Sequence, residues 1–374
     1  MRNKQLANTK TTRIIDSLYI HIPFCQHICH YCDFPKMLFD DNFARQYLEA
    51  MFAELDSYAI ERVATIYVGG GTPSSLPVDL LEKLLARIAT LLKEGGEFTF
   101  EVNVENATIE KLEILKRFGV NRLSVGIEST DDDILKDLNR HHTFAQAVAL
   151  IEAARLIGFA SMNVDLIYGL PGQDEEGLKR DLRNLIALGV EHISTYALSV
   201  NPGTVFFARG VKEQDQDDSR RDYDLILSTL REAGYERYEV SNFAKEGFQS
   251  RHNLTYWRDD EYYGVGLGAS GYIAGVRYDN TRSLKCYLER NYRSRSETIS
   301  LDEDEKYYLM LNLRLRDGFE KADYLARYGY RFEEKHALAI KSAISDGLML
   351  ISDDRIRLSD EGLMILDRIL LELI

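Results

Sequence analysis

The chain has 374 residues, enough for two or three domains at roughly 150 residues each. Apolar residues make up 45% of it and 60 acids exceed 46 bases, so a disordered chain is excluded and DNA or RNA is a poor expectation as a partner. No apolar run reaches the ~18 residues of a membrane span, and residues 1–17 form a polar tail unlike a secretory signal, so we expect a cytoplasmic protein.

Residues 18–235 alternate short apolar runs with longer amphipathic segments. The expected strands are Leu18–Pro23, Ala64–Val68, Glu97–Asn103, Arg122–Glu128, Met162–Tyr168 and His192–Leu198. The expected helices include Phe39–Arg62, Leu80–Leu92, Ile109–Phe118, Phe144–Ile157 and Glu175–Leu188. This alternation indicates βαβ units and a parallel sheet, which right-handed crossovers curl into a partial (β/α)6-type barrel. We therefore predict an α/β fold with functional groups on the loops after the strands.

After residue 235 the regular alternation of expected strands and helices ends. Residues 236–300 are rich in Tyr and Gly and predict a connecting lobe of hairpins and loops. Residues 301–374 predict a C-terminal α+β domain that resembles a winged helix. Its expected elements are helices Asp302–Arg316, Lys321–Tyr328 and Glu333–Asp346, a hairpin of Leu348–Ser352 with Arg355–Leu358, and helix Asp360–Leu373. Its many acids favour a structural or lid role over DNA binding.

Three of the four cysteines follow the first expected strand with the spacing Cys-x3-Cys-x2-Cys, at Cys25, Cys29 and Cys32. Three thiolates on one tight loop can hold three irons of a [4Fe–4S] cube and leave the fourth iron without a protein ligand. S-adenosylmethionine (SAM) can chelate that open iron through its amino and carboxylate groups. The alternative is a zinc site completed by His21, His27 or His30, although no second knuckle exists in the chain.

Polar residues recur at the ends of the next strands. Gly69, Gly70, Gly71, Thr72 and Pro73 follow the second strand, where a backbone without Cβ atoms can approach a ligand, or where a bare turn is made. Further along the chain come Glu101, Asn103, Glu128, Arg140 and Asp165. Carboxylates suit ribose hydroxyls, and the planar fork of Arg140 suits a carboxylate. Singly each is a cap or surface group, but together they favour a SAM site.

With these motifs the chain resembles the radical SAM family of oxygen-independent coproporphyrinogen III oxidases and, more closely, its heme-chaperone branch, HemW. The resemblance runs from Leu18 to the C-terminal helix. It implies that SAM is held by residues at the positions of Tyr19, Gly70, Gly71, Thr72, Glu101, Arg140 and Asp165. Glu128 departs from the family, which usually has Gln there. Phe34 stands where the oxidases have a fourth Cys, which argues against porphyrinogen decarboxylation.

The motif His-Asn-x-x-Tyr-Trp at residues 252–257 marks the same heme-chaperone branch and contains the chain's one Trp. Heme requires an axial donor and apolar or aromatic faces, which His252, Tyr256 and Trp257 could supply. Cys286 is a second candidate ligand. The alternative is a packed polar–aromatic corner in which His252 satisfies a buried backbone group. We expect this segment to fold over the open mouth of the barrel.

The leading interpretation is a radical SAM-type heme chaperone that binds a [4Fe–4S] cluster, SAM and heme. The resemblance implies delivery of heme to client hemoproteins such as respiratory enzymes, and a transient contact with a membrane surface stays open. The runner-up is an oxygen-independent coproporphyrinogen III oxidase of heme biosynthesis. A zinc-stabilised interaction protein is the third hypothesis, and it leaves the loops at Gly69–Thr72 and Asp165 unexplained.

Overall fold

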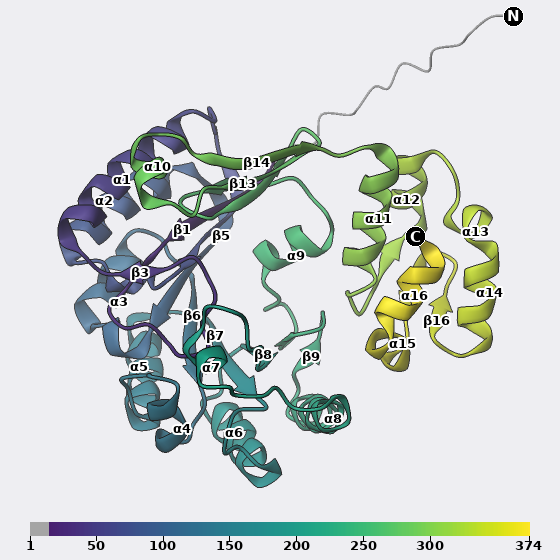
Figure 1. The fold of residues 1–374 in the computed structure, drawn as a ribbon, viewed down its shortest axis with the longest axis horizontal. Coiled ribbons are helices and arrows are strands. Elements are labelled where there is room, and N and C mark those ends of the chain that lie inside the picture. Colours follow the sequence, from purple (N-terminus) through teal and green to yellow (C-terminus); the bar gives the residue numbers. More distant parts are fainter. Residues whose placement is uncertain (1–14) are drawn as a thin grey trace, which may run out of the picture.

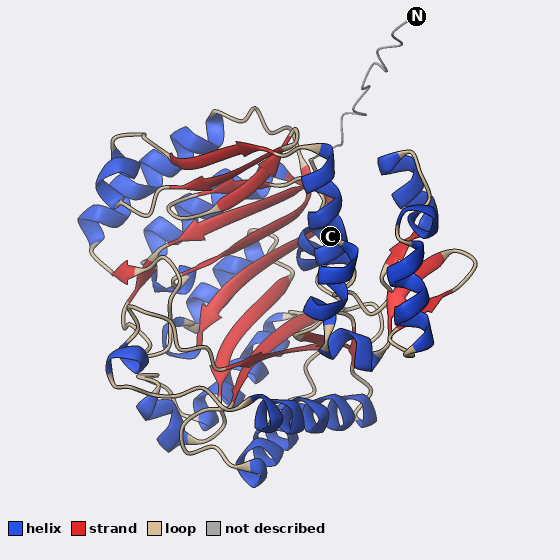
Figure 2. Ribbon diagram, turned by 45° about the vertical axis from the view of Figure 1, so that its right-hand side comes forward, coloured by secondary structure: helices blue, strands red, loops and turns tan. Residues whose placement is uncertain are grey.

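The computed structural model describes residues 15–374, so most of the expected N-terminal tail lies outside the described residues. Its centre is a run of parallel strands joined through helices. These strands are β1 (Ser17–Ile22), β4 (Val63–Gly70), β5 (Leu92–Asn103), β6 (Arg122–Glu128), β7 (Ser161–Tyr168) and β8 (His192–Ala197). They are neighbours in chain order and curve into a partial barrel (Figures 1 and 2). The predicted six-unit α/β barrel is confirmed.

Helices cover the convex side of this curved sheet (Figure 1). The main ones are α1 (Asp41–Asp56), α2 (Val78–Ile88), α3 (Ile109–Arg117), α5 (Phe144–Ile157), α6 (Glu175–Ala187) and α8 (Gln216–Glu232). Their apolar stripes pack on alternate strand residues in one continuous core. Helix α5 shows how its ends are defined: Thr143 and Gln146 form a capping box, and Gly158 ends the helix in a left-handed conformation.

Residues 236–300 join the barrel instead of standing apart from it. Strands β9 (Glu236–Arg237) and β10 (Asn242–Ala244) add antiparallel to β8, and β11 (Tyr263–Val265) adds parallel to β1, giving a nine-stranded sheet. The rest of this segment forms a second sheet and two helices. These are α9 (Arg251–Trp257), β12 (Ser270–Ile273), β13 (Val276–Asn280), α10 (Leu284–Leu288) and β14 (Arg293–Thr298).

Residues 301–374 form a C-terminal domain beside the barrel, with a hydrophobic core of their own (Figure 1). The expected hairpin and helices occur, but the expected helices Glu333–Asp346 and Asp360–Leu373 are each divided into two, at His336 and Ile365. They are α11 (Leu301–Asn312), α12 (Lys321–Tyr328), α13 (Phe332–Lys335), α14 (Ala337–Ser345), β16 (Met349–Ile351), β17 (Arg355–Leu358), α15 (Asp360–Met364) and α16 (Leu366–Leu373). A short strand, β15 (Phe319–Glu320), completes a three-stranded sheet by pairing with β17.

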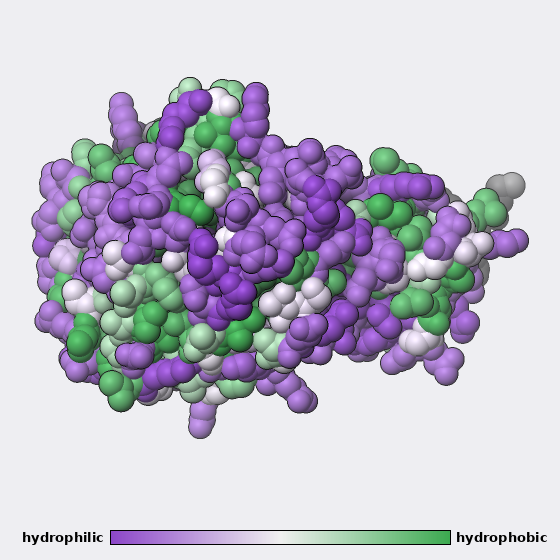
Figure 3. All heavy atoms as spheres, turned by 90° about the horizontal axis from the view of Figure 1, so that it is seen from below, coloured by the Kyte–Doolittle hydropathy of each residue, from purple (hydrophilic) through white to green (hydrophobic). Residues whose placement is uncertain are grey.

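Seen from below, the barrel carries hydrophobic side chains gathered among hydrophilic ones, whereas the surface toward the C-terminal domain is largely hydrophilic (Figure 3). Among residues 15–374, no helix combines the length and the apolar character that crossing a membrane requires.

Candidate functional site

A cavity of about 360 Å³ lies where the strands β4 to β8 end. This volume falls in the range of small-molecule sites. The cavity brings together nearly all the residues that the sequence predicted. Those lining it are Cys25, Cys29, Cys32, Gly70, Gly71, Thr72, Glu101, Glu128, Arg140 and Asp165. Tyr19 and the predicted heme-binding residues His252, Tyr256, Trp257 and Cys286 lie outside this lining.

The three cysteines lie on one loop whose base is closed by two short strands, β2 (Phe24–Cys25) and β3 (Met37–Leu38). Cys25 is buried, whereas Cys29 and Cys32 are partly exposed. The hydroxyl of Thr72 donates to Sγ of Cys25 at 3.5 Å. A Cβ on Gly71 would lie 2.9 Å from the same sulfur and 2.8 Å from the backbone of Pro23, so only glycine lets the loop after β4 approach this closely.

Burial raises the pKa of the Cys25 thiol and raises the pKa of Cys32 to about 11. Within residues 15–374, the three thiols do not lie close enough together to bind one metal ion as a group. The donor set nevertheless fits a [4Fe–4S] cluster with one open iron: three sulfurs from one loop line the cavity, and the fourth cysteine, Cys286, is absent from its lining.

Glu101 is fixed by two donors. The hydroxyl of Tyr67 donates to its Oε1 at 2.7 Å, and the backbone N–H of Gly70 donates to its Oε2 at 3.1 Å. Burial raises the pKa of Glu101 to about 7, and the nearby charge of Asp165 adds to this rise. An ionised carboxylate is therefore poorly compensated here, and a cationic ligand would relieve it.

Asp165 lies on β7, where Asn163 donates its amide to Oδ1 at 2.8 Å. Burial raises the pKa of Asp165 as well. The same Asn163 amide donates to the hydroxyl of Ser124, and its oxygen accepts from Ser194. The carboxylate thus stands at the end of a polar row that crosses β6, β7 and β8 and faces the cavity.

Glu128 ends β6 with φ of 72°, a left-handed conformation that is rare for a residue with a side chain. The strand register shifts between Gly126 and Glu128, and this irregularity turns the Glu128 side chain into the cavity. Burial raises the pKa of Glu128 to about 7. A protonated carboxyl can donate a hydrogen bond as an amide does, which reduces the difference from the Gln that the family usually has.

Arg140 reaches both the cavity and the cluster loop. Its Nη2 donates to the carbonyl of Gly126 at 2.6 Å, and its Nη1 lies 3.8 Å from Sγ of Cys29. Behind it, Oε2 of Glu105 lies 3.6 Å from Nη2 of Arg140 and 3.4 Å from Nδ1 of His142. Although burial opposes ionisation, these two neighbours hold the pKa of Glu105 at about 2.

Tyr19 does not line the cavity and instead packs behind Tyr67, which does. The hydroxyl of Tyr19 hydrogen-bonds Nδ1 of His21 at 3.0 Å. His21 has its other ring nitrogen on the carbonyl of Pro35. Since both nitrogens of His21 are engaged and the ring is buried, this histidine cannot complete a zinc site without leaving its place.

The expectation that the segment around His252 folds over the mouth is wrong. Helix α9 packs at the beginning of the strands, where Glu97 of β5 accepts hydrogen bonds from the backbone N–H groups of Arg251 and His252. His252 is fully buried, and its two ring nitrogens contact the hydroxyls of Thr65 and Tyr256, each at 2.8 Å. Burial lowers its pKa to about 3. As placed, His252 offers no open donor to an iron.

Sequence reasoning missed several lining residues. They are Tyr31, Lys36, Tyr67, Arg122, Ser124, Asn163, Ser194 and Tyr196. Several of these alternate with apolar residues on β6, β7 and β8, and a polar residue at every second position of a buried strand was the available signal. Arg122 is the most informative, because its Nε is buried with no hydrogen-bond partner among residues 15–374.

Comparison with known proteins agrees with this geometry. Residues 19–185 match the model of the Radical SAM superfamily, and residues 301–365 match the HemN C-terminal domain. A curated relative from Lactococcus lactis, named heme chaperone HemW, is 38% identical over 93% of this chain and 94% of its own length. The chain belongs to the HemW family. HemW proteins of Bacillus subtilis and Escherichia coli are 37% and 32% identical over 92% and 95% of this chain.

The fold of this HemW family member is also that of a solved oxidase. The structure of coproporphyrinogen III oxidase (HemN) from Escherichia coli, described as a radical SAM enzyme, superposes with a TM-score of 0.84. The match covers 97% of this chain and 90% of the oxidase at 23% sequence identity. At that identity the likeness establishes the fold of the barrel and of the C-terminal domain. It does not establish the reaction, which has to be argued from the residues of the site.

Proposed function

We propose that this protein is a radical SAM-type heme chaperone. It holds a [4Fe–4S] cluster on Cys25, Cys29 and Cys32, binds SAM in the adjoining cavity, and carries heme to client hemoproteins such as respiratory enzymes. The proposal rests on one observation: the three cysteines, Arg140 and the carboxyl groups of Glu101, Glu128 and Asp165 line the same cavity. The name of the relatives supports the heme part of it.

The chain's own residues divide the work of binding SAM. Glu101 and Asp165 present poorly compensated carboxylates that favour the positive charge and hydroxyls of SAM. Arg140 presents a guanidinium to the carboxylate of SAM, and the close approach of Gly71 lets backbone groups reach the ligand. Tyr19 supports this wall from behind through Tyr67. When bound, the reduced cluster supplies one electron for cleavage of the SAM sulfonium.

Phe34 separates this proposal from the runner-up, a coproporphyrinogen III oxidase. The oxidases of the resembled family have a cysteine at this position, whereas here a phenylalanine, 64% exposed, lies at the lip of the cavity. With reductant, SAM and coproporphyrinogen III, the reconstituted protein should yield no protoporphyrinogen IX. Multiple turnovers to the doubly decarboxylated product, detected by mass spectrometry, would establish the oxidase instead.

The direct test is anaerobic reconstitution followed by assays of iron, sulfide and heme on one preparation. A heme chaperone should carry about four irons and four sulfides and, in addition, bind heme and pass it to an apo-hemoprotein. A zinc-stabilised interaction protein would hold one zinc ion, no sulfide and no heme.

A further inference from the structure

Heme needs an axial ligand that can reach its iron, and the burial of the histidines narrows the choice. The chain has eight histidines, all of which lie within the described residues 15–374. Five of them are buried: His21, His142, His192, His252 and His336. An imidazole inside the core cannot reach the iron of a macrocycle of that size. The accessible histidines are His27, His30 and His141, and all three lie on or against the cluster loop.

His27 is the accessible histidine that lines the cluster cavity. Its ring stacks on that of His141, with centroids 3.6 Å apart and an angle of 12° between the planes. His141 comes from the loop after α4 (Asp132–Asp137), so a separate part of the chain holds the orientation of the His27 ring. Residues 15–374 provide no hydrogen bond to either ring nitrogen of His27. This imidazole is therefore accessible, oriented and unengaged, as an axial ligand requires.

The other two accessible histidines are less suited. His30 lies outside the cavity lining, and its Nδ1 is engaged by the carbonyl of Asp137 at 2.6 Å. Nε2 of His141 faces the amide oxygen of Asn139 at 3.3 Å. Their contacts place both as supports for the loop that carries His27.

Exposed apolar side chains lie at this mouth and beside the cluster loop. Phe34 lines the cavity together with Tyr196, and both side chains remain solvent-exposed. Leu38 pairs with Cys25 across the base of the cluster loop, and it is 61% exposed. Val205 and Phe207 flank Phe206, whose backbone N–H donates to the carbonyl of His30. Large apolar groups left in solvent around a cavity are typical of a binding site for a flat apolar ligand.

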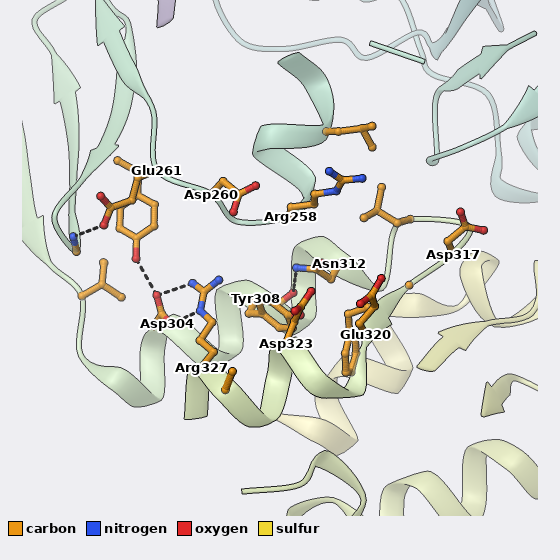
Figure 4. Close-up of a pocket in the computed structure, with 18 of the residues that line it drawn as sticks. Arg258, Asp260, Glu261, Asp304, Tyr308, Asn312, Asp317, Glu320, Asp323 and Arg327 are labelled. Carbon is orange, nitrogen blue, oxygen red and sulfur yellow. Dashed lines mark hydrogen bonds and ion pairs between the residues drawn. The ribbon is translucent and has the colours of Figure 1, made fainter. Parts of the chain in front are cut away.

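The balance of charged side chains is less acidic at this mouth than in the larger cleft of the molecule. The two propionates of heme are anionic at neutral pH, and this cavity is lined by the bases Lys36, Arg122 and Arg140 and by the acids Asp33, Glu101, Glu128 and Asp165. Lys36 donates to the carbonyl of Cys32 and has no carboxylate partner among the described residues. The larger cleft, of about 1070 Å³, lies between the barrel and the C-terminal domain (Figure 4). Its acidic lining residues are Asp260, Glu261, Asp304, Asp317, Glu320 and Asp323. They outnumber its arginines, and Arg327 is already paired with Asp304, so this cleft repels an anionic ligand.

We propose that heme binds at the mouth of the cluster cavity, with a ring nitrogen of His27 on the iron. Phe34 packs on one face of the macrocycle, and Lys36 pairs with a propionate. The site rests on the proposed heme-carrying function and assigns a place and a ligand to it. It also assigns the iron ligand to a residue other than His252, whose neighbour Asn253 reaches the same cavity from the opposite end of the barrel.

The test is a heme titration of the anaerobically reconstituted protein, followed by absorption spectroscopy, with iron and sulfide measured in every variant. His27→Ala should weaken heme binding by roughly tenfold or more, and His27→Met should retain heme with a spectrum moved from nitrogen toward thioether ligation. Phe34→Ala should weaken binding without moving the ligand bands. Gln26→Ala, the matched control, is exposed on the same loop and outside the cavity lining, and it should bind heme as the wild type does.

Since His27 lies between two proposed cluster ligands, the cluster-free protein is titrated in parallel, and the same order of affinities is expected there. His141→Ala, outside the cluster loop, should weaken binding a few-fold through loss of the stacking. A wild-type spectrum and affinity in both His27 variants, with loss of heme in His252→Gln or Cys286→Ala, would overturn this site and leave the chaperone function standing. Wild-type protein that binds no heme at all would instead refute the proposed function.

Discussion

Glu105 places a carboxylate oxygen 3.6 Å from Nη2 of Arg140, and the side chains of both are nearly closed to solvent, at 12% and 2% exposure. The carboxylate faces Nη2 of the guanidinium, whereas Nη1 lies 3.8 Å from Sγ of Cys29 on the cluster loop. Because a buried guanidinium without its counter-charge is costly, Glu105 fixes where Arg140 can sit. It acts as a positioning residue for the SAM site.

Glu105→Gln should therefore weaken SAM binding by about 1–2 kcal/mol, since the amide keeps the shape of the side chain and removes its charge. Isothermal titration of reconstituted protein measures this change. Glu110→Gln, on the exposed start of α3, serves as the control and should bind SAM normally. Unchanged affinity in Glu105→Gln would remove Glu105 from the support of Arg140.

Replacing Cys25, Cys29 or Cys32 by Ala should abolish the brown [4Fe–4S] absorption, because each removes one iron ligand. Far-UV circular dichroism should stay close to that of the wild type, since the loop is one edge of a large core. Cys286→Ala is the matched control, because Cys286 is the remaining cysteine and is absent from the cavity lining. Retention of four irons in Cys25→Ala would show that the ligand assignment is wrong.

SAM binding should strengthen as pH rises through 7 and level off above that value. The pKa of Glu101 is raised to about 7 in the folded protein, so its carboxylate, which attracts the cationic ligand, forms over that interval. Glu101→Gln should bind SAM more weakly and lose part of this dependence, since Glu128, whose pKa is also raised to about 7, lines the same cavity. Titrations at pH 6 and pH 8 on both proteins decide the matter, and parallel profiles would assign the dependence to another group.

The same shift affects the stability of the ligand-free protein. A carboxyl whose pKa is raised on folding favours the folded state at low pH, and its contribution is lost as pH rises from the unfolded value near 4.5 through 7. Glu101→Gln should therefore gain in thermal midpoint relative to the wild type as pH rises over that range. An equal difference between the two proteins at pH 5 and pH 8 would contradict this account.

Glu97→Ala should destabilise the fold by about 1–3 kcal/mol, because Glu97 accepts hydrogen bonds from the first backbone N–H groups of α9 and no other group takes its place. Chemical denaturation measures the change. Glu94→Ala, exposed on the same strand, should change stability by less than about 0.5 kcal/mol. Equal effects of the two substitutions would mean that the contact adds nothing.

Short apolar runs that alternate with amphipathic segments were sufficient to predict the barrel strands, because each buried strand carries its own local pattern. The largest difference is at β5, which begins at Leu92 and not at Glu97. The end of α1 was less predictable: the amphipathic pattern continues to Arg62, whereas the helix stops at Asp56. The residues of the cavity were found for a similar reason, since Gly70 and Glu128 end their strands and Glu101 lies near the end of β5.

The position of α9 could not be read from the sequence, because it depends on contacts far along the chain. Nothing local to His252 indicates that Thr65 will take one of its nitrogens or that Glu97 will cap its helix. The inward turn of Glu128 was equally hidden, since it results from a register shift between β6 and β7 and not from the residues beside it.

The pairing of β1 with β11 determines when the barrel can be completed during synthesis of the chain. The hydroxyl of Ser17, at the start of β1, bonds that of Thr255 across 238 residues, and β11 covers the outer edge of β1. During synthesis on the ribosome, the outer edge of β1 therefore has no strand to pair with until nearly three quarters of the chain has emerged. A fragment cut at residue 235, the boundary that composition suggests, would keep that edge bare and should aggregate instead of folding.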